Sequence, residues 1–362
     1  MAQIIRSIAL IFFTFFLLAG ICRADETQQI TEEGYVSKSF EAGKFVMEHV
    51  SDAYEWHIAS FGETHISIPL PIILYSTDKG LNIFMSSKFH HGHETYMDFR
   101  IEHEGKNEGK IVEIDEKGEV IGLPIDLSIT KTVAGIFVSV TILLLIFLSI
   151  AKKAKQRVNQ APSGIQNLFE PVILFIRDEV AKPAIGEKRF EKFMPFLLTA
   201  FFFILINNIL GLIPIFPFGA NVTGNIAVTL VLALFTFFIT TVNGNKHYWK
   251  EIYNPDVPWW LKIPIPLMPI VELSGLITKP FVLMVRLFAN MLAGHMIITV
   301  FVSLIFIFNS LMGVEAGLGV SVISVAFSVF IVLLDVLVSF IQAYVFTLLS
   351  ALYFGMATSE HH

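Results

Sequence analysis

The chain has 362 residues, of which 54% are hydrophobic and 15% are charged, and its mean hydropathy is +0.67. This composition is typical of a membrane protein and excludes an ordinary water-soluble globular chain. The net charge of −6 is unevenly spread, because residues 25–126 contain twenty acids and eight Lys/Arg, whereas the remainder of the mature chain is mildly basic. That asymmetry separates an acidic soluble segment from a membrane-embedded body.

Residues 1–24 have the pattern of a secretory signal peptide. Arg6 supplies the positive n-region and Ile8 to Leu18 the apolar core, and Cys22-Arg23-Ala24 offers small residues at the positions that determine cleavage. We expect cleavage after Ala24, which leaves a mature chain without thiol chemistry because Cys22 is the single cysteine. The alternative is a retained membrane helix, against which the short apolar run argues. A lipoprotein signal is disfavoured because Ile21 precedes the cysteine.

Residues 25–126 predict a small β-rich extracytoplasmic domain. Short strand-like runs cover residues 66–75, 81–85, 95–101 and 110–114. Turns are predicted at Asp78-Lys-Gly and Glu116-Lys-Gly. The segment also holds seven of the eleven histidines, with a cluster at residues 89–94. Such a cluster can bind zinc or copper, but no cysteine and no second spaced group of ligands accompanies it. We therefore predict a solvated acidic surface without a metal.

Residues 127–362 predict an all-α polytopic membrane domain of about five segments. The apolar runs are residues 133–150, 193–213, 226–242, 270–308 and 320–354. The last two are about 39 and 35 residues long, whereas a perpendicular crossing needs only ~20 residues. Both are therefore expected to be strongly tilted, broken, or partly in the membrane plane.

The distribution of Lys and Arg predicts the orientation. Residues 152–192 hold nine Lys/Arg, so the positive-inside rule places this connection in the cytoplasm and the N-terminal domain outside. The connections 214–225 and 309–319 contain no Lys or Arg and are predicted to lie outside, which leaves the C-terminus in the cytoplasm. The Trp259-Trp260 pair, flanked by prolines, predicts an interfacial segment.

Arg286 lies in a stretch apolar enough to be embedded in the membrane. A guanidinium stays protonated at any physiological pH, and placing it at bilayer depth costs between ~2.5 and ~17 kcal/mol. The charge therefore requires an anionic partner or a water-filled path. His295 follows nine positions later, on the opposite side of a straight helix, which argues against a simple His–Arg pair.

A polar stripe marks the last apolar segment. Asp335, Gln342 and Tyr353 are spaced by seven and eleven positions and therefore fall on one helix face. Such a stripe indicates hydration or a polar partner, and interhelical hydrogen bonding that only holds the bundle together is the alternative. His295 and Asp335 together could relay protons, and a satisfied buried histidine is the alternative.

Several of these residues stand in sequence patterns that resemble a known family. The patterns are Lys279-Pro280, Arg286-Leu-Phe-Ala-Asn290-Met-Leu-Ala-Gly-His295, Asn208 with Gly211-Leu-Ile-Pro214, Asn225-Ile-Ala-Val-Thr-Leu, and a final helix with Gln342 and Tyr353. Together they resemble subunit a of the rotary (F-type) ATP synthase, from about residue 130 to the C-terminus. The resemblance implies a proton-translocating stator with two half-channels that reach the carboxylates of the c-ring. Such a stator couples proton flow to rotation and ATP synthesis.

The resemblance also implies roles for individual residues. Arg286 would be the essential ion-translocation residue that faces a ring carboxylate, with Asn290 to orient or hydrate it. The proton pathway would comprise Asn208, His295, Asp335, Gln342 and Tyr353. In subunit a the positions of His295 and Asp335 hold an exchangeable ionisable pair, here in the order His then Asp. Gly211 departs from the family, since some members place an acid there, and Ala289 replaces a more usual glycine.

Glu272 and Lys279 precede Arg286 by fourteen and seven positions, on roughly the same face. Glu272 could mark the inner exit for ions, and an interfacial anchor is the alternative; Lys279 is expected to snorkel. The implied partners are the c-ring, the peripheral-stalk subunit b, the rest of the complex and the lipid bilayer, with no nucleic acid. The implied location is the bacterial inner membrane, and the subunit makes or breaks no bonds and needs no cofactor.

Two other classes of protein are alternatives to this interpretation. A secondary transporter predicts a repeat with broken helices in matching halves, and an intramembrane metalloprotease predicts an HExxH-type motif; the sequence has neither. Sodium in place of protons stays open, because ion choice would rest largely on ring residues outside this chain.

Overall fold

The computed structural model describes residues 51–61, 64–77, 79–92, 94–102, 105–115, 117–156, 164–213, 215–253 and 267–359. The predicted signal peptide and the Trp259-Trp260 segment lie outside these residues. Contacts divide the chain into two compact units: residues 1–134 with 298–330, and residues 135–297 with 331–362.

The first unit contains three small antiparallel sheets. They are the hairpin β1 (Glu55–Phe61)–β2 (Thr64–Pro69), a sheet of order β4 (Gly80–Met85)–β3 (Pro71–Ser76)–β8 (Ile125–Asp126), and a sheet of order β5 (Phe99–Ile101)–β6 (Ile111–Ile114)–β7 (Val120–Gly122). Short 3₁₀ turns, η1 (Ser86–Phe89) and η2 (Gly105–Asn107), connect strands. The predicted β-rich N-terminal segment is confirmed.

Alternation along the strands builds the core of this β-rich region. Ile72 and Leu74 of β3 are fully buried and pack with Phe89 and Phe99, whereas Tyr75 on the other face of β3 is exposed. The strand predicted at residues 95–101 is wrong in its first half. Met97 and Asp98 have φ of +52° and +60°, so this stretch turns and only β5 remains extended.

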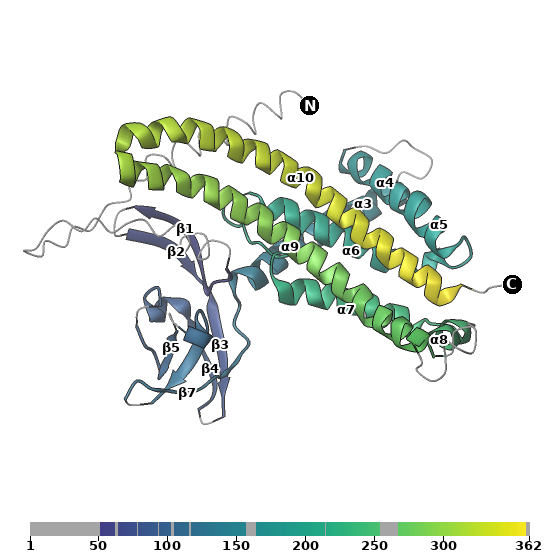
Figure 1. Ribbon diagram of the computed structural model, residues 1–362, viewed down its shortest axis with the longest axis horizontal. Coiled ribbons are helices and arrows are strands. Elements are labelled where there is room, and N and C mark those ends of the chain that lie inside the picture. Colours follow the sequence, from purple (N-terminus) through teal and green to yellow (C-terminus); the bar gives the residue numbers. More distant parts are fainter. Residues whose placement is uncertain are drawn as a thin grey trace, which may run out of the picture. The chain divides into compact units, whose positions relative to one another are not determined.

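The remainder of the described chain is mainly helical, as predicted (Figure 1). The elements are α3 (Lys131–Gln156), α4 (Ile165–Phe175), the π-helix η3 (Ile176–Ala181), α5 (Lys182–Ile185), α6 (Phe190–Gly211), α7 (Ile226–Val242), α8 (Lys246–Tyr253), α9 (Leu267–Met312) and α10 (Val314–Thr358). Of the described helices, α3, α6, α9 and α10 are each long and apolar enough to cross a membrane, and α7 with α8, bent by 105°, forms a fifth candidate. Because lipid offers no hydrogen-bond partners, such apolar segments must satisfy their backbone groups internally as helices.

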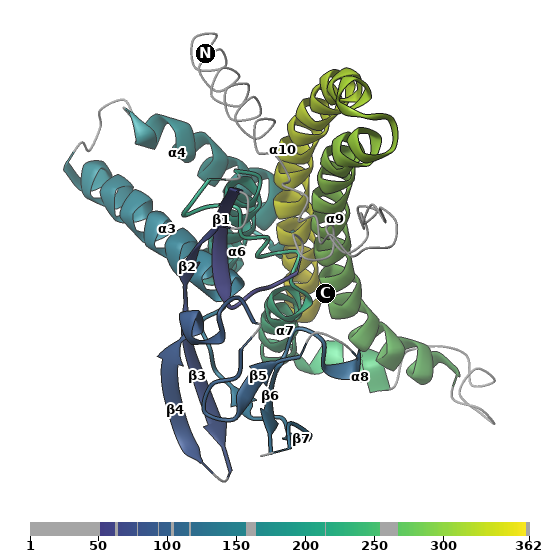
Figure 2. The ribbon, with the colours of Figure 1, turned by 90° about the vertical axis from the view of Figure 1, so that its left-hand side faces the viewer.

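Helices α9 and α10 are neighbours in both views and are each continuous (Figures 1 and 2). At ~1.5 Å per residue, 46 and 45 residues extend for roughly 69 and 68 Å, more than twice a ~30 Å hydrocarbon core. The predicted loop at 309–319 is wrong, because helix continues on both sides of a single linking residue. Gly313 makes that link with φ of +87°, a conformation that glycine adopts without strain.

The connection between α3 and α6, predicted as a cytoplasmic loop, is largely helical. Ile176, Val180 and Ala181 of η3 are fully buried in the core of the second unit, which also draws on α6, α7, α9 and α10. The approach is close where α5 meets α10, since a Cβ added at Gly355 would fall on the carbonyl oxygen of Ala184. Residues 165–185 are therefore part of the packed helical body.

Candidate ion-translocation site

The exposed face of α9 carries a permanent charge among apolar side chains. Arg286 and Asn290 are one turn apart on this face, and both are exposed. Val282 and Val285 beside them are 38% and 37% exposed. The opposite face of α9 faces the core, where Leu283 and Leu287 are 1% exposed, as is expected for one helix with two environments. The Arg286 side chain therefore faces away from the helical core of this chain and can contact a neighbouring molecule.

The carboxylate of Asp335, on α10, lies directly against Gly294 of α9. A Cβ added at Gly294 would be 2.7 Å from Oδ2 and 2.9 Å from Oδ1 of Asp335, so only glycine leaves room for this acid. The Oδ2 atom is buried and has no hydrogen-bond partner among the described residues. A buried carboxylate oxygen without a protein partner is a place where water or a transferred proton is stabilised.

His295 lies beside the end of α6. Its Nε2 atom is 3.6 Å from the position that a Cβ on Gly211 would take, and the carbonyl oxygen of Ala220 is 3.1 Å from the same position. The Ala220 carbonyl is therefore the tighter neighbour of position 211, and the imidazole is at ordinary van der Waals distance from it. His295 is half-buried and lies on a different side of α9 from the exposed Arg286, as their spacing predicts.

One turn before Gly211, Asn208 is completely buried on α6. Its Oδ1 accepts a 2.5 Å hydrogen bond from the Thr223 hydroxyl, whereas its Nδ2 has no partner among the described residues. The carboxamide is thus fixed with its donor end unsatisfied. Asn225, also part of the motif pattern, caps α7 by accepting from the Ala227 amide at 2.9 Å.

Further along α10, Gln342 is 7% exposed, and Tyr353 is half-buried with the Lys279 ammonium 5.7 Å from its ring centroid. Lys279 therefore contacts an aromatic ring of the stripe and does more than snorkel. Ser339, between Asp335 and Gln342, donates to the backbone carbonyl of Asp335 at 2.7 Å and not to its buried Oδ2. The stripe faces protein along α10.

The cluster thus comprises His295 beside Gly211, Asp335 beside Gly294, and Asn208 one turn before Gly211 on α6. Glu272 is half-buried and lies fourteen residues before Arg286, roughly 21 Å along α9, so it is not part of this cluster. Sequence reasoning missed the spatial role of Gly294 and the contact of Thr223. The only signal for Gly294 was its place beside His295 in the motif.

Comparison with known proteins supplies the family. A family model described as "ATP synthase A chain" matches residues 133–355. This chain belongs to the ATP synthase subunit a family. A protein named ATP synthase subunit a from Chloroherpeton thalassium is 45% identical over 243 residues, covering 65% of this chain and 68% of that protein. The proteins of that name from Chlorobium phaeobacteroides strain BS1 and Myxococcus xanthus are 48% and 42% identical, covering 65% and 66% of this chain and 67% and 75% of theirs.

As a subunit a of F-type ATP synthase, the chain is a multi-pass membrane protein whose partners are the rest of that complex. The N-terminal segment has a separate match: residues 45–127 fit a model described as "Domain of unknown function (DUF8433)". In the described part of that segment, His91 lies 3.0 Å from Glu55 and His90 lies 3.6 Å from Glu94. The described residues contain no group of three or more ligands able to hold a metal; His93 lies outside them.

Proposed function

We propose that this subunit a conducts protons through two half-channels that reach the ring of c subunits, with Arg286 between them. The observation that carries the proposal is the position of Arg286 and Asn290 on the exposed face of α9, among exposed valines. A cation in apolar surroundings is stabilised by a carboxylate from a neighbouring subunit. The c-ring would supply that carboxylate, and the guanidinium would keep it ionised while it passes.

The outer half-channel would use the cluster around Gly211 and Gly294. A proton from outside would pass Asn208 and reach His295 and Asp335, with Gln342 farther along the same stripe. The unsatisfied Nδ2 of Asn208 and Oδ2 of Asp335 support this path, because buried polar atoms without protein partners are suited to bound water. A ring carboxylate neutralised there could rotate into lipid, since a protonated acid is desolvated far more cheaply than an ion.

The inner half-channel would leave past Tyr353 and Glu272 toward the cytoplasm. Arg286 cannot release a proton, so it would prevent a direct leak between the two paths. The membrane potential would supply ~2.3 kcal/mol per charge per 100 mV. The subunit would couple this flow to rotation and perform no bond chemistry itself.

The same proposal covers the chain's organisation. Residues 1–24 would be a signal peptide, 25–126 an extracytoplasmic domain, and 127–362 the stator domain in the bacterial inner membrane, with the C-terminus in the cytoplasm. The nine Lys/Arg of residues 152–192 support this orientation. The peripheral-stalk subunit b would hold the stator in place.

The deciding experiment is ATP-driven proton pumping in inverted vesicles that contain the assembled complex. Arg286→Ala and Arg286→Gln should abolish pumping while assembly stays normal, because no fixed charge then holds the ring carboxylate ionised. Val282→Ala, on the same exposed face, is the matched control and should pump normally. Pumping by Arg286→Ala at the wild-type rate would refute the proposed role.

A further inference from the structure

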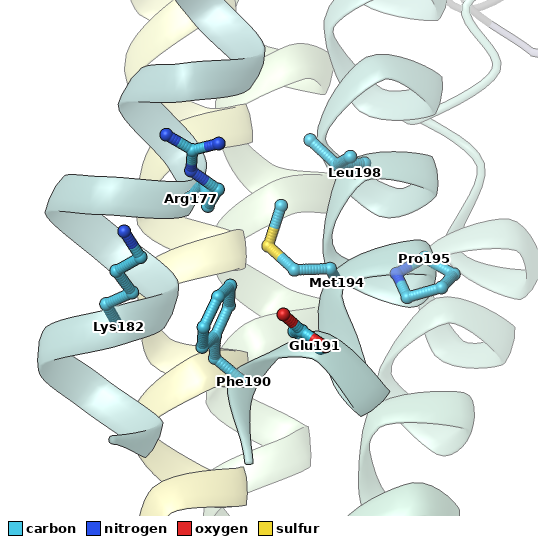
Figure 3. A pocket seen from close by; sticks show the side chains of 7 residues that line it. All are labelled: Arg177, Lys182, Phe190, Glu191, Met194, Pro195 and Leu198. Atoms are coloured by element: carbon cyan, nitrogen blue, oxygen red, sulfur yellow. The ribbon is translucent and has the colours of Figure 1, made fainter. Parts of the chain in front are cut away.

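A pocket of about 560 Å³ lies beside the first turns of α6, away from the ion-translocation site (Figure 3). One wall comes from the η3–α5 segment and carries Arg177 and Lys182. The facing wall is the start of α6, which contributes Glu191 and the apolar side chains of Met194 and Leu198. In Figure 3 the Met194 and Leu198 side chains extend from α6 toward the segment that carries the two cations.

The cationic wall carries an excess of one positive charge. Arg177 donates through Nε and Nη2 to Asp178 at 3.0 and 2.9 Å, and Lys182 donates to the same carboxylate at 2.6 Å. These hydrogen bonds hold the pKa of Asp178 well below its ordinary value, so the carboxylate stays ionised. Asp178 engages two of the five guanidinium N–H groups and one of the three ammonium hydrogens, and the remaining donors can receive an anion.

The facing wall carries one negative charge, that of Glu191, and its other lining side chains are apolar. Glu191 is exposed in the first turn of α6. Phe190 borders the pocket and lies 5.6 Å from the Lys182 ammonium, measured to the ring centroid. From Met194 and Leu198 the helix continues into an apolar span. The pocket therefore offers a site for an anion, a site for a cation and an apolar surface that continues along α6.

We propose that this pocket binds a phospholipid with a primary ammonium headgroup, a phosphatidylethanolamine. The phosphodiester would lie between Arg177 and Lys182, the ammonium would donate to Glu191, and an acyl chain would follow Met194 and Leu198. A phosphatidylethanolamine balances both charges of the pocket, whereas an anionic headgroup would leave Glu191 unpaired beside added negative charge. A choline headgroup has no N–H group to donate to the carboxylate. The proposal is independent of the half-channels.

The test uses the assembled complex in vesicles that contain photoactivatable phosphatidylethanolamine or phosphatidylglycerol of the same acyl chains. Crosslinks to residues 190–198 are quantified by peptide mass spectrometry. In the wild type, the ethanolamine lipid should crosslink at least about fivefold more than the glycerol lipid. Arg177→Gln combined with Lys182→Gln should reduce crosslinking of both lipids by about tenfold, the loss expected for a charge-assisted hydrogen bond.

Glu191→Gln separates headgroup recognition from a general effect on folding, because Glu191 is exposed and makes no contact with Asp178. This variant should lose the preference for the ethanolamine lipid while crosslinking to the glycerol lipid stays unchanged or rises. Lys188→Gln, an exposed lysine that does not line the pocket, should match the wild type. Equal crosslinking of both lipids in the wild type, or a preference retained by Glu191→Gln, would overturn the proposal. Displacement of both lipids by inorganic phosphate alone would assign the pocket to a free anion and overturn it as well.

Discussion

Replacing Gly294 with alanine tests the arrangement of α9 and α10 at the acid. The added Cβ would lie 2.7 Å from Oδ2, 2.9 Å from Oδ1 and 3.0 Å from Cγ of Asp335, whereas ordinary contact begins at 3.4 Å. The carboxylate must therefore move by about 0.7 Å at its nearest atom, and because Cγ is also too close, it cannot escape by rotating its oxygens alone. Displacements of this size can cost up to ~100-fold in a rate that depends on precise positioning.

We expect Gly294→Ala to lower proton pumping by about tenfold or more while the complex still assembles. Stability should change little, because the helix propensity of alanine, favourable by ~1 kcal/mol over glycine, offsets part of an overpacking cost of ~1–3 kcal/mol. The matched control is Gly275→Ala on the same helix, where an added Cβ meets nothing within 4 Å. Gly275→Ala should assemble and pump like the wild type.

The assay is ATP-driven acidification of inverted vesicles, with assembly measured by the ATPase activity that remains bound to the membranes. Pumping by Gly294→Ala at the Gly275→Ala rate would show that the position of the Asp335 carboxylate does not limit conduction. An equal loss in both variants would show that any alanine in α9 is harmful, and the steric argument would then fail.

Three further predictions concern packing and titration. Thr223→Val should destabilise the purified complex by about 1–3 kcal/mol, because the buried Oδ1 of Asn208 loses the hydroxyl that donates to it. Thr223→Ser keeps a hydroxyl and should melt like the wild type. Equal melting of all three proteins would contradict this prediction. Gly355→Ala should prevent normal assembly, because α10 must separate from Ala184 of α5, and unchanged amounts of subunit in the membrane would refute the close approach. Burial and a 2.5 Å hydrogen bond to Asp126 raise the pKa of Tyr54 above its ordinary value near 10. The folded protein therefore keeps the phenol neutral at a pH where the unfolded chain loses the proton. The stability that the neutral phenol contributes is full below pH ~10, and the free energy of unfolding falls as the pH rises above it. The melting temperature of Tyr54→Phe should therefore fall less than that of the wild type between pH 9 and pH 11, and a parallel fall in both would exclude Tyr54 as the source.

Part of the fold follows from the amino-acid sequence because lipid restricts the backbone. Apolar runs in a bilayer must become helices, so the segment predicted at residues 226–242 is α7 at those bounds. The runs 133–150, 270–308 and 320–354 lie within α3, α9 and α10, and the run 193–213 extends two residues beyond the end of α6. The strand-like runs predicted at residues 66–75 and 81–85 are strands in the structure, although the first is divided at Leu70 into β2 and β3, which belong to different sheets. The motif around Arg286 identified the family, and the family match confirms it.

The tertiary structure decided the rest, because periodicity gives a residue's face on its own helix and not the segment that meets it. The burial of η3 could not be read from a Lys/Arg-rich connection. The extension of α9 and α10 to either side of Gly313 could not be read from residues 309–319, which lack apolar periodicity. Gly211 was interpreted only as a position without the acid, yet the Ala220 carbonyl approaches it closely and His295 from another helix lies beside it. Gly294 carried no prediction of its own, yet it makes room for Asp335, forty-one positions later in the chain. A glycine's contribution is the space it leaves, and only the packed neighbours reveal what fills that space.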